Sequence, residues 1–123
     1  MSSTVSIAVY GTLKKGLSNH TTYMKNAAYI GKGKTFDSYK MVIENGIPFV
    51  FSKTSESGFN ITVEVYKIDL PTLDDIDVLE EHPNWYVRKQ IPILLESKKI
   101  EIAWMYFNDT VIDSGIYLNN FVE

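Results

Sequence analysis

The residues best suited to chemistry lie at the end of a predicted helix. In the stretch "DLPTLDDIDVLEEHP", residues 69–83, a turn of roughly 100° per residue places Leu73, Ile76 and Glu80 on one face. A carboxylate on an apolar helix face is costly to bury unless it has a partner or a function. Desolvation would raise its pKa toward neutrality, which suits a general acid/base. The alternative is that the last helical turn frays and Glu80 pairs with Arg88 or a lysine.

The opposite face of the same helix carries acidic side chains. Asp74, Asp77 and Glu81 fall on this face, and we expect them to be solvated. Asp69 is a suitable N-cap. The residue before a proline is disfavoured in the α region, so the helix is expected to stop at His82.

A second candidate site is the stretch "VYGTLKKGLSNH", residues 9–20. Gly11 and Gly16 have the spacing of a Walker phosphate-binding loop, but Leu17 stands where its lysine belongs. A strand that runs into such a turn presents backbone N–H groups in a concave surface, which favours an anion. Without the lysine, a small carboxylate is a more suitable ligand than a triphosphate. The alternative is an ordinary strand-to-helix turn whose glycines only relax the backbone.

Several aromatic and histidine residues have simpler interpretations. Trp85, Tyr86 and Tyr106 are expected to be core or cavity-wall residues, where they would help to exclude water from a neighbouring glutamate. His20 and His82 are expected to make local hydrogen bonds rather than to act in catalysis. The sequence contains no nucleophile-elbow motif, and a serine–histidine–aspartate triad is therefore not predicted.

The elements that would position these residues are mostly strands. Alternating apolar residues and turn signals predict about six strands, within the normal size of a sheet. They cover residues 4–10, a hairpin over 39–52 that turns at Asn45-Gly46, 58–69, and a hairpin over 87–107 that turns near Ser97-Lys98. A short helix is expected within residues 18–27, and the tail from Asp109 to Glu123 is expected to have little regular structure.

The composition predicts a single globular domain over residues 1–123. Hydrophobic residues make up 45% and charged residues 22%, and the net charge of −3 offers no basic surface for nucleic acid. The absence of cysteine excludes disulfides, thiolate nucleophiles and cysteine-ligated zinc, and two histidines are too few for a histidine-rich metal site. The N-terminus lacks a basic flank and a long apolar run, so we expect a cytoplasmic protein that does not bind membranes.

Two ordered motifs resemble those of a known family. The loop of residues 9–20 is similar to a family pattern of tyrosine-glycine-threonine-leucine, two often basic residues, glycine, and then asparagine-histidine. The segment "IDVLEEHPNWYVR" matches a second pattern of an acidic residue before a proline, a tyrosine and an arginine. The sequence therefore looks like a member of the γ-glutamylcyclotransferase-like superfamily, most closely the γ-glutamylamine cyclotransferases. The likeness covers essentially the whole chain.

The resemblance implies an α+β fold: a small mixed β-barrel of about six strands flanked by short helices. It also implies a cavity with the glycine-containing loop as its floor and the glutamate on its wall. It assigns the acid/base role to Glu80, binding of the glutamyl end of the substrate to Tyr10, Gly11, Thr12 and Leu13, and a lining role to Tyr86. One departure is Val63, which stands before Glu64 where the family often has glycine and which would reshape the pocket.

The implied reaction needs one well-placed carboxylate. The α-amino group of a γ-glutamyl amine closes onto the γ-carbonyl, giving 5-oxoproline and a free amine, with no metal or cofactor. The expected partner is thus a small γ-glutamyl compound such as γ-glutamyl-ε-lysine. The alternatives are a cyclotransferase for γ-glutamyl amino acids or a specialised metabolite, a non-catalytic barrel that binds small molecules or proteins, and a nucleotide-binding module.

Overall fold

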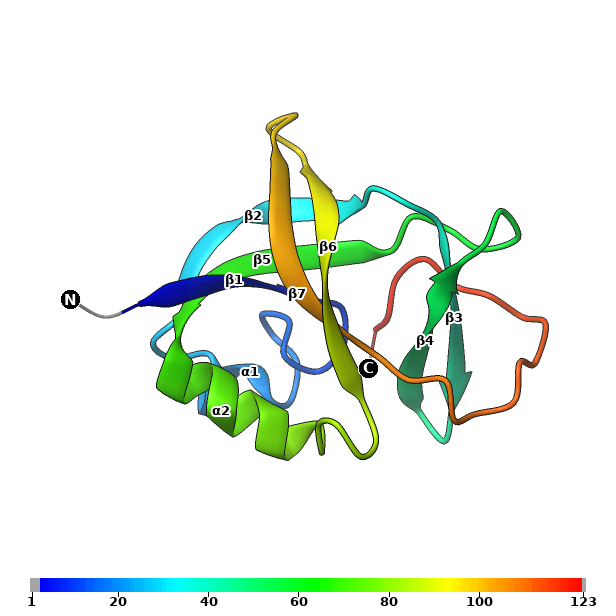
Figure 1. Ribbon diagram of the computed structural model, residues 1–123, viewed down its shortest axis with the longest axis horizontal. Coiled ribbons are helices and arrows are strands. Elements are labelled where there is room, and N and C mark those ends of the chain that lie inside the picture. Colours follow the sequence, from blue (N-terminus) through cyan, green and yellow to red (C-terminus); the bar gives the residue numbers. More distant parts are fainter. Residues whose placement is uncertain (1–2, 123) are drawn as a thin grey trace.

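The computed structural model describes residues 3–122, which form seven strands and two short helices (Figure 1). The strands are β1 (Thr4–Val9), β2 (Ala28–Thr35), β3 (Tyr39–Glu44), β4 (Ile47–Thr54), β5 (Thr62–Asp69), β6 (Val87–Leu95) and β7 (Ile100–Phe107). Five of them close a barrel in the order β1-β5-β2-β6-β7, and β3 and β4 form a separate hairpin sheet. The α+β class, with a mixed barrel and short flanking helices, is confirmed. Residues 1, 2 and 123 of the predicted domain lie outside the described residues.

The barrel is closed by one parallel contact. β1 pairs with β7 in parallel at Ile7 and Trp104, whereas the other neighbouring strands pair antiparallel. Because the barrel is closed, β1 has a paired strand on each side and no free edge. β1 ends at Val9, and the glycine-containing loop begins there.

Strand β2 is the element that the sequence analysis does not predict. It carries Gly31 and Gly33, which weaken a strand signal, and most of its side chains are exposed. Gly33 is required by packing: a Cβ atom there would lie 2.5 Å from the carbonyl oxygen of Leu94 on β6. Gly33, which weakens the strand signal in the sequence, therefore allows β6 to approach β2.

The β3–β4 hairpin turns where the sequence predicts. Asn45 and Gly46 have φ values of 53° and 76°, the left-handed conformations that a tight turn requires. The backbone N–H of Asn108, just after β7, donates to the carbonyl of Val50 at 2.9 Å and ties the hairpin to the barrel.

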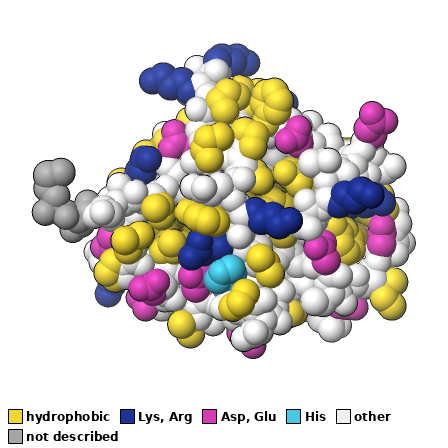
Figure 2. Space-filling model, in the orientation of Figure 1, with side chains coloured by type: hydrophobic (Ala, Val, Ile, Leu, Met, Phe, Trp, Pro, Cys, Tyr) yellow, Lys and Arg dark blue, Asp and Glu magenta, His cyan; other side chains and the backbone are white. Residues whose placement is uncertain are grey.

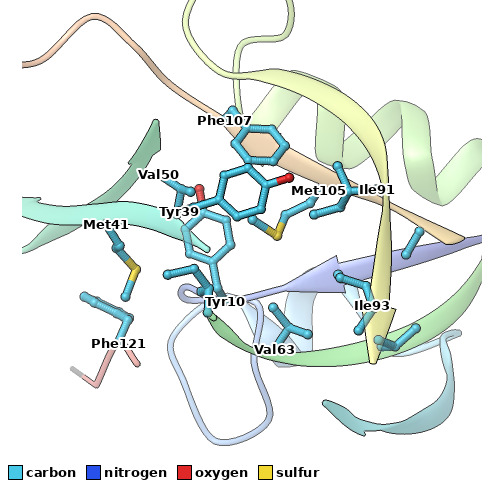
Figure 3. Close-up of a cluster of buried hydrophobic side chains, with 14 of the residues drawn as sticks. Tyr10, Tyr39, Met41, Val50, Val63, Ile91, Ile93, Met105, Phe107 and Phe121 are labelled. Carbon is cyan, nitrogen blue, oxygen red and sulfur yellow. The ribbon is translucent and has the colours of Figure 1, made fainter. Parts of the chain in front are cut away.

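The inner apolar cluster combines side chains from β1, β5, β6 and β7 with others from β3, β4, the loop after β1 and the tail (Figure 3). A second apolar cluster lies on the outside, where Ile7 and Val9 of β1 pack with Leu73 and Ile76. The two clusters follow the alternation of side chains along β1, because Ala8 belongs to the inner one.

Helix α2 (Leu70–Leu79) begins as predicted, because the Asp69 carboxylate accepts the backbone N–H of Thr72 at 2.8 Å. It ends at Leu79 rather than at His82. Glu80 is the C-cap, and Glu81 adopts a left-handed φ of 54°, which breaks the helix before the proline is reached. Helix α1 (His20–Tyr23) is likewise shorter than the predicted 18–27. Within residues 3–122, neither helix is long and apolar enough to cross a bilayer.

The tail after β7 has no regular structure, as predicted, but it is anchored. The N–H of Thr62 donates to the carbonyl of Asn119 at 2.7 Å, and the N–H of Leu118 donates to that of Met41 at 3.0 Å. Phe121 is only 4% exposed and belongs to the inner cluster (Figure 3). On the face drawn in Figure 2, the Lys and Arg side chains form separate groups rather than a continuous stripe.

The packing of α2 predicts a strong difference between two of its branched side chains. Ile76 is fully buried whereas Val78 is 76% exposed. We expect Ile76→Ala to lower the free energy of unfolding by about 2–4 kcal/mol through cavity formation. Val78→Ala should change it by less than about 0.5 kcal/mol. Urea unfolding at neutral pH measures both, and equal losses would show that α2 presents a different face to the barrel.

Candidate active site

One cavity brings together all the residues that the sequence analysis assigns to a site. It has a volume of about 260 Å³ and lies where the end of β1, the end of α2 and the β3–β4 turn meet. Its lining includes the six assigned residues, Tyr10, Gly11, Thr12, Leu13, Glu80 and Tyr86. The rest of the lining is contributed by Ala8, Val9, Asn19, Gly46, Ile47, Pro48, Leu79, Trp85 and Tyr106. The individual roles of these residues remain predictions.

The glycine-containing loop uses its later amides to hold itself in place. The N–H of Lys14 donates to the carbonyl of Gly11, that of Leu17 to the carbonyl of Lys14, and that of Asn19 to the carbonyl of Thr12, at 3.0–3.1 Å. The N–H of Lys15 donates to Glu64 Oε1 at 2.8 Å. Among residues 3–122, no hydrogen bond engages the amides of Gly11, Thr12 or Leu13. Backbone donors near a cavity need a partner, so these amides are suited to an anionic ligand.

Asn19 orients the side chain of Thr12, whereas the sequence indicated it only as a possible N-cap of the short helix and gave it no role in the site. Its Nδ2 donates to Thr12 Oγ1 at 2.7 Å. A hydroxyl that accepts a hydrogen bond still has its own proton to donate, so Thr12 has a donor left for a ligand. The only signal in the sequence was the asparagine-histidine pair of the loop motif. His20, the second member, places Nδ1 2.8 Å from the carbonyl of Leu13, a local hydrogen bond as predicted.

Glu80 is mostly buried at the C-terminal end of α2. Among the described residues, no group hydrogen-bonds to its carboxylate, and desolvation raises its pKa from 4.5 to about 7. Its backbone N–H donates to Ile76 O at 2.9 Å, which keeps the residue on the last turn. A carboxyl that titrates near neutrality can both accept and donate a proton there.

The alternative pairing of Glu80 with Arg88 is wrong, as is the prediction that Asp77 is solvated. Arg88 donates to Asp77 through Nε at 2.8 Å and through Nη2 at 3.1 Å, and Tyr106 Oη donates to Asp77 at 2.6 Å. Burial acts to raise the pKa of Asp77, but these hydrogen bonds outweigh it and hold the pKa below its ordinary value. The pairing with Arg88 could not be read from a helix wheel, because β6 and β7 approach this face from elsewhere in the chain.

The aromatic wall of the cavity has its hydroxyl groups occupied. Tyr86 Oη donates to the carbonyl of Pro48 at 2.7 Å, and the ring stacks on Phe49 with centroids 5.6 Å apart. Trp85 packs edge-on against Tyr86 at 5.0 Å. Tyr10 Oη donates to the carbonyl of Tyr106 at 2.8 Å, so its phenol is directed away from a ligand and into the core. Trp85, Tyr86 and Tyr106 are therefore cavity-wall residues, as predicted.

Val63 does not have the position that the sequence analysis expected. It is fully buried in the barrel interior and is not part of the cavity lining. Its neighbour Glu64 turns the other way, under the loop, where it accepts hydrogen bonds from the amide of Lys15 and from Tyr66 Oη at 2.8 and 2.9 Å. A valine at position 63 therefore fills the core instead of narrowing the cavity.

The charge of the lining is simple. Among the lining residues that the structure describes, Glu80 is the only acidic one, and none is a Lys, Arg or His. Within residues 3–122, no three acidic or histidine side chains are grouped so as to hold a metal ion. The cavity thus combines one titratable carboxyl, free amides and apolar walls.

Comparison with known proteins identifies the family. The family model described as "Gamma-glutamyl cyclotransferase, AIG2-like" matches residues 7–119. A protein of Methanocaldococcus jannaschii, provisionally named a gamma-glutamylcyclotransferase, is 44% identical over 115 residues, which cover 90% of this chain and 93% of that protein. Gamma-glutamylaminecyclotransferase C of Danio rerio is 34% identical over 115 residues, covering 85% of this chain and 75% of its own length.

A solved structure has the same arrangement of elements. The crystal structure of an AIG2-like protein from Mus musculus superposes with a TM-score of 0.87 at 27% identity, covering 97% of this chain and 88% of that one. The region matched by the family model contains both the glycine-containing loop and Glu80. The chain belongs to the gamma-glutamyl cyclotransferase, AIG2-like family.

Proposed function

We propose that the protein cyclises the γ-glutamyl group of a γ-glutamyl amine to 5-oxoproline and releases the free amine. The observation that carries this proposal is that Glu80 and the amides of residues 11–13, which have no hydrogen-bond partners within residues 3–122, lie at one cavity. The family supports a cyclotransferase reaction, and the cavity supports a small substrate with an anionic end.

The free amides suit the α-carboxylate of the substrate. Bound there, the glutamyl chain can fold back so that its α-amino group faces its own γ-carbonyl carbon. Holding this conformer is the main service an enzyme can give to an intramolecular reaction. The Thr12 hydroxyl adds a further donor beside the amides.

Glu80 can carry protons between the two nitrogen atoms. It accepts a proton from the substrate ammonium, the amine forms a bond to the γ-carbon, and the bond from that carbon to the departing amine breaks. Overall the attacking nitrogen gives up two protons and the departing amine takes up two, leaving as an ammonium ion. A carboxyl with a pKa of about 7 is suited to both directions of transfer.

The walls favour one class of leaving group. In a γ-glutamyl amino acid, a second carboxylate lies one carbon away from the departing nitrogen. No cation lines the cavity to pair with it, and Glu80 would repel it. Ile47, Leu79 and Trp85 instead offer apolar surface to an aliphatic amine such as the side chain of lysine, whose charged end is several carbons away.

Glu80→Gln tests the acid/base role. Loss of proton transfer should lower kcat by at least about a hundredfold, while KM changes little because the glutamine keeps the shape of the side chain. Release of 5-oxoproline from γ-glutamyl-ε-lysine is the measurement. The neighbouring and exposed Glu81→Gln is the matched control and should retain wild-type turnover. Near-normal kcat in Glu80→Gln would remove Glu80 from the mechanism.

The buried carboxyl also predicts a pH-dependent stability difference. The folded-state pKa of about 7 exceeds the ordinary 4.5, so ionisation of Glu80 destabilises the folded state as the pH rises between these values. Relative to Glu80→Gln, the wild type should lose on the order of 2 kcal/mol of unfolding free energy between pH 4 and pH 8. Urea unfolding at both pH values measures the difference, and Glu81→Gln should follow the wild type. Parallel curves for wild type and Glu80→Gln would show that Glu80 is solvated.

The charge of the leaving group is tested by substrates that differ in one carboxylate. We expect kcat/KM to be about tenfold or more higher for γ-glutamyl-ε-lysine and γ-glutamyl-alaninamide than for γ-glutamyl-alanine. Equal kcat/KM values for γ-glutamyl-alanine and γ-glutamyl-alaninamide would contradict the expected preference for a leaving group without a carboxylate next to the departing nitrogen. Binding of these compounds without release of 5-oxoproline would instead favour a non-catalytic barrel.

A further inference from the structure

Lys14 is a buried cation that the proposed reaction does not use. Its side chain is 7% exposed, and Nζ donates to Asn120 Oδ1 at 2.8 Å and to the carbonyl of Phe121 at 2.6 Å. Both acceptors are neutral, and among the described residues no carboxylate lies within ion-pair distance of it. Burial lowers the pKa of Lys14, and the more distant Glu64 carboxylate acts in the opposite direction. The burial of the Lys14 ammonium group against neutral acceptors suggests that this residue has a specific role.

The backbone of Lys14 belongs to the turn that carries the free amides. Its N–H donates to the carbonyl of Gly11 at 3.1 Å and its carbonyl accepts the N–H of Leu17 at 3.0 Å. The side chain is not part of the cavity lining but leaves the turn for the C-terminal tail. One residue therefore connects the floor of the cavity to a segment more than a hundred positions away in the sequence.

The tail offers Lys14 acceptors that are held in place. Phe121 is buried in the inner cluster, to which Tyr10 also belongs (Figure 3). The carbonyl of Asn119 accepts the N–H of Thr62 on β5 at 2.7 Å. The core and the barrel therefore position the part of the tail that supplies the Phe121 carbonyl.

The next residue provides a natural comparison. The side chain of Lys15 is exposed, and only its backbone takes part, through the N–H that donates to Glu64 at 2.8 Å. Two adjacent lysines thus hold the turn in different ways. Removing the side chain of Lys15 leaves its anchor intact, whereas removing the side chain of Lys14 breaks the connection to the tail.

We propose that Lys14 is a positioning residue. It anchors the turn that carries the amides of residues 11–13 to the C-terminal tail and so keeps these amides directed into the cavity. The effect on substrate rests on the proposed function. Because these amides would bind the α-carboxylate equally in the ground state and in the transition state, losing the anchor changes KM and not kcat.

The kinetic test compares Lys14→Met with Lys15→Met. Methionine keeps most of the side-chain volume but removes the charge and the donors. We expect KM for γ-glutamyl-ε-lysine to rise about tenfold in Lys14→Met, with kcat within about twofold of wild type. Lys15→Met should leave both constants unchanged. A Lys14→Met variant that melts at a lower temperature but keeps the wild-type KM would show that the residue serves stability alone and would overturn the proposal.

Hydrogen exchange tests the connection without any substrate. The hydrogen-bonded amides of residues 14–19 should exchange faster in Lys14→Met and also in Asn120→Ala, a mild change at an exposed tail position, but not in Lys15→Met. Unchanged exchange in the turn of both Lys14→Met and Asn120→Ala would overturn the proposal. If the wild type releases no 5-oxoproline, the proposed function fails, while exchange still decides whether the tail holds the turn.

Discussion

The candidate site depends on one carboxyl group that is mostly removed from water and has no hydrogen-bond partner among residues 3–122. Glu80 occupies this position because α2 packs through Leu73 and Ile76 against the outside of the barrel and places its C-cap residue at a largely apolar cavity. Burial raises the pKa of the carboxyl to about 7 with no charged group responsible for the shift. A carboxyl whose pKa is raised by burial in a cavity is a common feature of functional sites.

The same helix shows how strongly surroundings decide the behaviour of an acid. Asp77, one turn before Glu80, is held ionised by Arg88 and Tyr106, while Glu80 is left without donors. The Asp77 contacts join the end of α2 to β6 and β7 and so restrict where the glutamate can lie. Two carboxyls on one short helix thus have separate tasks, one as a structural anion and one as a titratable group in the cavity.

Local signals in the sequence predicted more than long-range ones. The N-cap at Asp69 and the turn at Asn45-Gly46 depend on neighbouring residues, and both were predicted correctly. β2 was not predicted, because Gly33 is required by the close approach of β6 and weakens the strand signal. The partner of Asp77 was not predicted, because Arg88 lies on another element. The assigned site residues could be predicted because they belong to two sequence motifs, and all of them line one cavity. The β3–β4 turn, which completes the cavity, has no such motif.

The account requires one small molecule to reach both Glu80 and the amides of residues 11–13. A crystal structure with bound 5-oxoproline tests this most directly. We predict that its carboxylate accepts hydrogen bonds from those amides and that its ring nitrogen faces the Glu80 carboxyl. A ring bound in the cavity with its carboxylate directed away from the loop, or bound elsewhere on the protein, would contradict the account.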